Sequence, residues 1–148
     1  MEQTTVTIGN TQWTVMVATT YSEVSQGLSD VSNLAPGTGM LFVLGADYPY
    51  IPIDMSRMLF PLDIIFISSD LRVTGIFRNV QPQETDVFCY GAYFLEVNAG
   101  EAEGIELGDS VSLGALQVRP ALWETIGQIA LATMIVIPLV VVLGKDMR

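Results

Sequence analysis

Apolar and polar positions alternate through much of the first part of the chain, a pattern typical of short β-strands. Residues 4–8 and 11–18 are rich in β-branched side chains and flank a Gly-Asn pair, which predicts a β-hairpin. Continuous apolar runs predict buried strands at residues 39–44 and, within residues 58–68, after Pro61. Further strands are expected at residues 72–77, 93–97 and 110–113.

Helical signals are few in this part of the chain. Thr20 and Glu23 have the spacing of a capping box, and Val24 and Leu28 follow at helical spacing, so one short helix should end near Gly27 or Leu28. A single helical turn is expected at 102–105, and irregular segments at 45–53 and 78–88. The predicted fold is mainly β: a small barrel-like antiparallel or mixed sheet with one or two short helices.

The C-terminal part changes this picture, because residues 126–144 carry no charge. Nineteen helical residues span about 28 Å, close to the hydrocarbon thickness of a bilayer, which predicts one transmembrane helix. A buried core helix is the alternative. Trp123 before the span and Lys145 and Arg148 after it suit the membrane interface. The expected domains are an acidic β-domain at 1–118, a linker at 119–125, the span at 126–144 and a basic tail at 145–148.

The chain is expected to be a single-pass protein of the cell membrane. Two sequence signals predict opposite orientations for it. The first ten residues lack the basic start and apolar core of a signal peptide, which favours a cytoplasmic β-domain. The positive-inside rule favours the opposite orientation, because Lys145 and Arg148 follow the span. We expect the cytoplasmic arrangement and leave the opposite one open.

Charge and composition exclude several classes of function. Residues 1–120 carry four arginines against fourteen acids, so the whole excess of negative charge lies there and nucleic acid is not an expected partner. The chain has no histidine and one cysteine. Imidazole-based catalysis, histidine metal sites and an internal disulfide are therefore excluded, and no cofactor is expected.

Two sets of side chains are candidates for binding. Asp63, Glu96, Asn98 and Arg57 could line a ligand pocket or an oxygen-only cation site. Alternatively, backbone N–H groups at a strand end, or Arg57 or Arg72, could satisfy Asp63. The second set comprises candidate interface residues, which could instead fold back onto the barrel or face lipid: Tyr48, Tyr50 and Ile51 on a loop, and Gly127, Gln128, Ala130 and Thr133 in the span.

Several sequence blocks carry a family resemblance. Gly-Met-Leu-Phe at 39–42, Pro-Leu-Asp-Ile-Ile-Phe-Ile at 61–67 and Leu-Glu-Val-Asn-Ala-Gly at 95–100 occur in that order. The chain resembles, over about residues 6–111, the uncharacterised family "domain of unknown function 192". The resemblance implies a compact β-rich fold and implies no reaction. Relatives carry an aromatic–Trp–Met–Lys–Asn–Thr run at the positions of residues 53–58, of which this chain keeps the methionine, Met55.

Together these features favour a non-catalytic, membrane-anchored accessory subunit that docks on and stabilises the other subunits of a larger membrane complex, such as a respiratory or photosynthetic electron-transfer complex. Two other hypotheses stay open. One is a membrane-tethered enzyme or small-ligand-binding module with a pocket around Asp63 and Glu96. The other is an assembly factor that binds its partner transiently.

Overall fold

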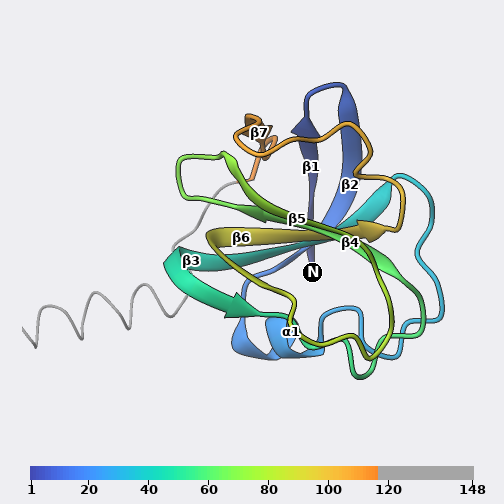
Figure 1. Ribbon diagram of the computed structural model, residues 1–148. Coiled ribbons are helices and arrows are strands. Elements are labelled where there is room, and N and C mark those ends of the chain that lie inside the picture. Colours follow the sequence, from blue (N-terminus) through green and yellow to red (C-terminus); the bar gives the residue numbers. More distant parts are fainter. Residues whose placement is uncertain (117–148) are drawn as a thin grey trace, which may run out of the picture. The chain divides into compact units, whose positions relative to one another are not determined.

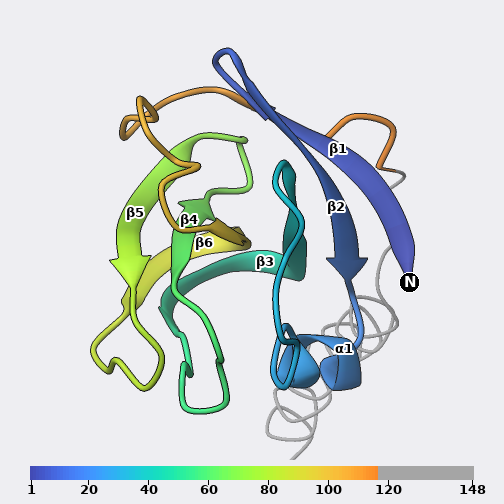
Figure 2. The same cartoon turned by 90° about the vertical axis from the view of Figure 1, so that its right-hand side faces the viewer.

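The computed structural model describes residues 1–116, which form a seven-stranded sheet curled into a half-barrel (Figures 1 and 2). Figure 2 shows the curl, with the first two strands on one side and the fourth and fifth on the other. The strands are β1 (Glu2–Ile8), β2 (Thr11–Ala18), β3 (Thr38–Pro52), β4 (Leu62–Ile67), β5 (Val73–Val80), β6 (Phe88–Asn98) and β7 (Val111–Ser112). The mainly β prediction is confirmed.

The strand order is β5-β4-β6-β3-β2-β1-β7, and the neighbours pair antiparallel except β2 and β3. A parallel pair needs a crossover, and the segment between β2 and β3 contains the helix α1 (Tyr21–Gln26). At one end the two sheet edges meet: β7 pairs with β1, and a bridge joins Arg72, just before β5, to Ser110. The sheet is therefore mixed and barrel-like, as predicted.

Alternating side chains divide the core into two layers. The inner layer contains Val6 from β1 and Val73 from β5, so residues near both edges of the sheet meet inside the curl. The outer layer lies on the opposite face of β3, β4 and β6, and Leu28 beside α1 belongs to it. Hydrophobic burial on both faces accounts for β4, in which all six residues are buried.

Helix α1 forms because of the predicted capping box. The Thr20 hydroxyl accepts a hydrogen bond from the Glu23 N–H, and the Glu23 carboxylate accepts from the N–H groups of Thr19 and Thr20. These backbone N–H groups lower the pKa of Glu23. Gly27 ends the helix with a φ of 48°, a left-handed value that favours glycine. The predicted helix is confirmed.

The irregular segment predicted at 45–53 is wrong, and the one predicted at 78–88 is shorter than expected, since residues 81–87 are irregular and its ends belong to strands. Strand β3 continues to Pro52, through the expected loop at 45–53, and pairs with the first residues of β6, where the polar connection at 78–88 was expected to end. The register shifts between Val43 and Tyr48 and again before Ile51, and such bulges break the two-residue alternation that identifies a strand in a sequence. Strand β5 likewise runs to Val80, three residues beyond the expected end.

The predicted membrane segment lies outside the described residues. No helix within residues 1–116 is long and apolar enough to cross a bilayer. Residues 117–148 are not described. This range contains the last two residues of the expected β-domain and the expected linker, span and tail, with Trp123, Gly127, Gln128, Ala130, Thr133, Lys145 and Arg148.

Candidate functional site

Asp63 is a fully buried structural carboxylate at the start of β4. One oxygen accepts the N–H of Asn79 at 2.8 Å, and the other accepts the N–H groups of Gly100 and Ala102 at 2.9 Å each. Asp63 therefore fixes β5 and the turn after β6 to β4. The interpretation that backbone N–H groups satisfy Asp63 is confirmed. Arg72, its other candidate partner, donates instead to the Gly108 carbonyl and the Ser110 hydroxyl.

The structure does not bring Asp63 and Glu96 together. Asp63 lies opposite Val97 in the β4–β6 register and shares the inner face with it. Glu96 lies opposite Ile64 on β4 and Met40 on β3, so its side chain projects to the outer face. The predicted pocket formed by both acids is therefore wrong, because the register places them on opposite faces of the sheet.

Asn98 and Arg57, the other predicted pocket residues, have separate partners. The Asn98 amide donates to the Leu34 carbonyl at 2.9 Å, which ties β6 to the segment before β3. Arg57 donates to the Ser25 carbonyl at 3.3 Å and pairs with Asp30 at 3.7 Å, near the surface. Of the four predicted residues, Arg57 and Glu96 line the same cleft.

Glu96 has an unusual environment for a carboxyl group. Its side chain is 5% exposed, and it has no hydrogen-bond or ionic partner among residues 1–116. Burial raises its pKa to about 8, because desolvation disfavours the ionised form. The group is therefore a neutral acid at pH 7, able to donate one hydrogen bond or to ionise when a cation arrives.

The Glu96 cleft, as we name it, is a hollow of about 360 Å³ between α1, the loop after it and the outer face of β3 and β6. Phe42 and Phe94 form part of its wall, with ring centroids 4.2 Å apart and planes inclined by 9°. Asp54 and Arg57 also line it, so charged and apolar side chains share its surface. The sequence indicated Glu96 as a candidate but did not indicate Phe42 and Phe94. These two rings come together beside Glu96 only because β3 pairs with β6.

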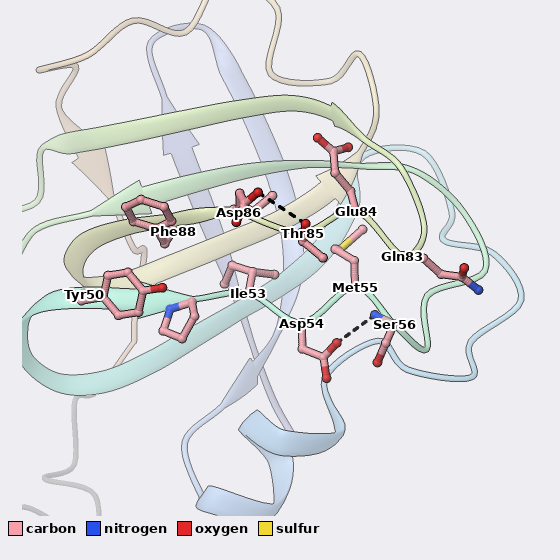
Figure 3. Close-up of a pocket in the computed structure, with 12 residues that line it drawn as sticks. Tyr50, Ile53, Asp54, Met55, Ser56, Gln83, Glu84, Thr85, Asp86 and Phe88 are labelled. Carbon is pink, nitrogen blue, oxygen red and sulfur yellow. Dashed lines mark hydrogen bonds between the residues drawn. The ribbon is translucent and has the colours of Figure 1, made fainter.

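A second cleft of about 480 Å³ lies next to the first (Figure 3). Residues around Asp54 form one side and residues from Gln83 to Phe88 the other. Asp54 accepts the Ser56 N–H at 2.9 Å, and hydrogen bonds from the hydroxyl and N–H of Ser56 lower its pKa. Ile53 and Asp54 line both clefts. They belong to residues 53–58, the run in which this chain differs from the family pattern given above.

Four exposed aromatic side chains occupy the paired ends of β3 and β6, and we call them the aromatic ribbon: Tyr48, Tyr50, Phe88 and Tyr90. Each is between 47% and 57% exposed. The rings of Tyr50 and Phe88 lie 4.9 Å apart, and Figure 3 shows them side by side. Ile51, a predicted interface residue, is 7% exposed and packs into the outer core layer, so that prediction is wrong. Phe88 and Tyr90 were not predicted, although the alternation Phe-Cys-Tyr at 88–90 indicates two rings on one face of a strand.

The chain is thus a small β half-barrel protein with two adjacent clefts and an exposed aromatic ribbon. The chain belongs to the family DUF192, described as "Uncharacterized ACR", whose match covers residues 4–113. This confirms the family resemblance.

Two crystal structures share the fold. One, described as a "putative transcription regulator" from Sinorhizobium meliloti 1021, is 30% identical, with a TM-score of 0.69 over 76% of this chain and 94% of its own. The other, a protein of unknown function from Novosphingobium aromaticivorans DSM 12444, is 30% identical, with a TM-score of 0.65 over 74% of this chain and 83% of its own. No curated protein matches the chain.

The raised pKa of Glu96 predicts a pH-dependent stability. Between the ordinary pKa of 4.5 and the folded value of about 8, the folded state holds a proton that the unfolded state has lost. The free energy of unfolding should therefore fall by up to about 1.4 kcal/mol per pH unit across this range and level off above it. Chemical denaturation of the full chain from pH 5 to 9 should show that Glu96→Gln removes this slope. A variant with the wild-type slope would contradict the assignment.

Proposed function

We propose that the protein is a non-catalytic, membrane-anchored accessory subunit whose β-domain docks on another subunit of a membrane complex. The aromatic ribbon is the observation that carries this proposal. Tyrosine and phenylalanine are enriched in the buried centres of protein interfaces, where large rigid rings exclude water. Two paired strands fix the backbone that carries the four rings, and Tyr50 contacts Phe88, so no backbone entropy is lost when a partner covers them.

The charge around the aromatic ribbon indicates the chemistry of the partner. Asp47, Asp54, Glu84 and Asp86 lie on or next to the strand ends and loops that flank the ribbon, and all are near the surface. The complementary surface is an apolar patch bordered by lysine or arginine. Nucleic acid does not offer such a basic surface. The acidic residues around the ribbon would repel its phosphates. A role like the one named for the Sinorhizobium neighbour is therefore not proposed for this chain.

The remaining features of the proposal come from the sequence. Residues 126–144 would cross the membrane once and leave the β-domain in the cytoplasm, beside the partner. A respiratory or photosynthetic electron-transfer complex is the setting we favour. Small residues in the span, Gly127 and Ala130, would permit close packing against a neighbouring helix.

The proposal predicts the effect of removing the aromatic ribbon. In the double variant Tyr50→Ser/Phe88→Ser, the protein should lose its partner when native membranes are solubilised in mild detergent, because interface aromatics contribute about 2 kcal/mol or more each, about 30-fold in affinity. Size-exclusion chromatography of the tagged protein, with mass spectrometry of its fraction, measures this loss. Tyr21→Ser is the matched control: Tyr21 is 81% exposed but lies on α1, outside the ribbon.

The stoichiometry distinguishes a subunit from an assembly factor. A subunit remains in the mature complex at a fixed ratio to its neighbours, whereas an assembly factor is found with partly assembled species. A wild-type protein that runs strictly as a monomer from native membranes would defeat the proposal, and so would a double variant that keeps its partner as Tyr21→Ser does.

A further inference from the structure

We propose that the Glu96 cleft is a binding site for an organic ammonium group carried on an apolar stem, either a free amine or the lysine side chain of a protein. The site is separate from the aromatic ribbon. The docking function proposed above does not require this ligand. A cleft of about 360 Å³ is within the size range of small-ligand sites.

The position of Glu96 supplies the polar half of the site. Glu96 is 5% exposed as a residue and lines the cleft, and its carboxyl has no partner among residues 1–116. Buried polar groups normally have hydrogen-bond partners, because an unpaired one costs free energy. A ligand donor would satisfy this carboxyl. Among possible donors, an ammonium gains the most, because it forms a charge-assisted ion pair with a carboxyl that solvent barely reaches.

The walls supply the apolar half. The stacked rings of Phe42 and Phe94 line the cleft, and Phe94 lies two residues before Glu96 on the same face of β6. Aromatic walls suit the methylene groups next to an amine, and a ring face attracts a cation. A free anion could bind only to the protonated form of Glu96, whereas an ammonium pairs with the ionised form, so the two ligand classes have opposite pH dependence.

The charged groups at the cleft are consistent with a cationic ligand. Arg57 is the cation that lines the cleft, and its guanidinium is held at the surface by Asp30 and the Ser25 carbonyl. Asp54 lines the cleft too and interacts electrostatically with Arg57, whereas the nearest acid of α1, Glu23, lies outside the lining and accepts from the N–H groups of Thr19 and Thr20. Neither arginine nor lysine neutralises Glu96 from β3, β4 or β6, whose adjoining residues are Met40, Ile64 and Phe94.

Binding is coupled to a proton. The arriving ammonium keeps its own protons, and Glu96 releases its proton to solvent as it ionises. The apparent affinity should therefore rise about tenfold per pH unit below pH 8 and become constant above it. A neutral analogue of the same shape should show no such dependence.

The experiment compares benzylammonium with benzyl alcohol on the full chain, by isothermal titration calorimetry between pH 6 and 8.5. We expect benzylammonium to bind at least about tenfold more tightly at pH 8, with the pH dependence described above. A blocked tripeptide with a central lysine forms the second arm. Tighter binding by the peptide assigns the site to a protein partner, and tighter binding by benzylammonium assigns it to a free amine.

Two variants complete the test. Glu96→Gln keeps the shape of the side chain and should bind both small probes equally and without pH dependence, whereas Glu103→Gln, an exposed carboxyl outside the cleft, should behave as wild type. The pH profile of the wild type needs no variant, so it decides the matter even if Glu96→Gln fails to fold. Equal affinity for the two probes, a flat pH profile, or no binding in either arm would overturn the proposal.

Discussion

Replacing Asp63 with alanine should lower the free energy of unfolding by about 4 kcal/mol, because three backbone N–H groups, of which that of Ala102 is buried, lose their acceptor together. The side chain of Asp63 is fully buried, and two of its donors belong to the turn after β6. Ala102 is fully buried in the inner core layer, so water cannot replace the carboxylate at its N–H without opening that layer. Chemical denaturation of the full chain, followed by far-UV circular dichroism at pH 6, measures the loss.

Asp63→Asn and Glu103→Ala provide the graded comparison. Asparagine keeps one acceptor oxygen but turns an amide N–H toward the remaining donors, so a loss of about 2 kcal/mol is expected. Glu103 is exposed, and its replacement should change stability by less than about 0.5 kcal/mol. If Asp63→Ala were as stable as wild type, the three hydrogen bonds would not be what holds the turn after β6 against β4.

Local signals in the sequence predicted the local structure well. The hairpin of β1 and β2 follows from two alternating runs around a Gly-Asn turn, and α1 follows from its capping box. Both are decided by residues within a few positions of each other. The long ends of β3 and β6 were missed because their alternation is broken by bulges, and only their mutual pairing makes them strands.

The candidate site shows a different limit. Each strand's own alternation was readable, so Asp63 could be grouped with Ile65 and Glu96 with Phe94. Whether two strands present those groups on one face depends on their register, and a slip of one residue would reverse the answer. The observed pairing of Asp63 with Val97 separates the two acids. One becomes a structural acceptor and the other lines the Glu96 cleft.

The departure of residues 53–58 from the family pattern now has a structural meaning. Met55, the retained residue, is 1% exposed and belongs to the outer core layer. Its neighbours Asp54 and Ser56 face the clefts, where relatives carry a tryptophan and a lysine. Met55 is kept, whereas the exposed residues Asp54, Ser56 and Arg57 differ, and so does Met58, which is also buried. Relatives with the full run should therefore present a different charge at the same clefts.

Gly39→Ala should cost about 3 kcal/mol of stability, because the backbone of β6 lies where the new Cβ on β3 would be. A Cβ added at Gly39 would lie 2.5 Å from the Glu96 carbonyl oxygen and 3.0 Å from a methyl of Val97. The strands must separate to relieve this overlap, which disturbs packing on both faces. Gly37→Ala is the matched control: Gly37 has a φ of 71° but open space around it, so about 1 kcal/mol is expected.

The same substitution should reach the Glu96 cleft. Separation of β3 from β6 beside residue 96 would admit water to a carboxyl whose pKa is raised by burial alone. The pKa of Glu96 should then move down from about 8 toward its ordinary value in Gly39→Ala and stay in place in Gly37→Ala. Carbon-13 NMR titration of the glutamate carboxyl groups measures both shifts. An unchanged pKa in a destabilised Gly39→Ala would show that the cleft is held by its aromatic wall and α1 and does not depend on the β3–β6 contact.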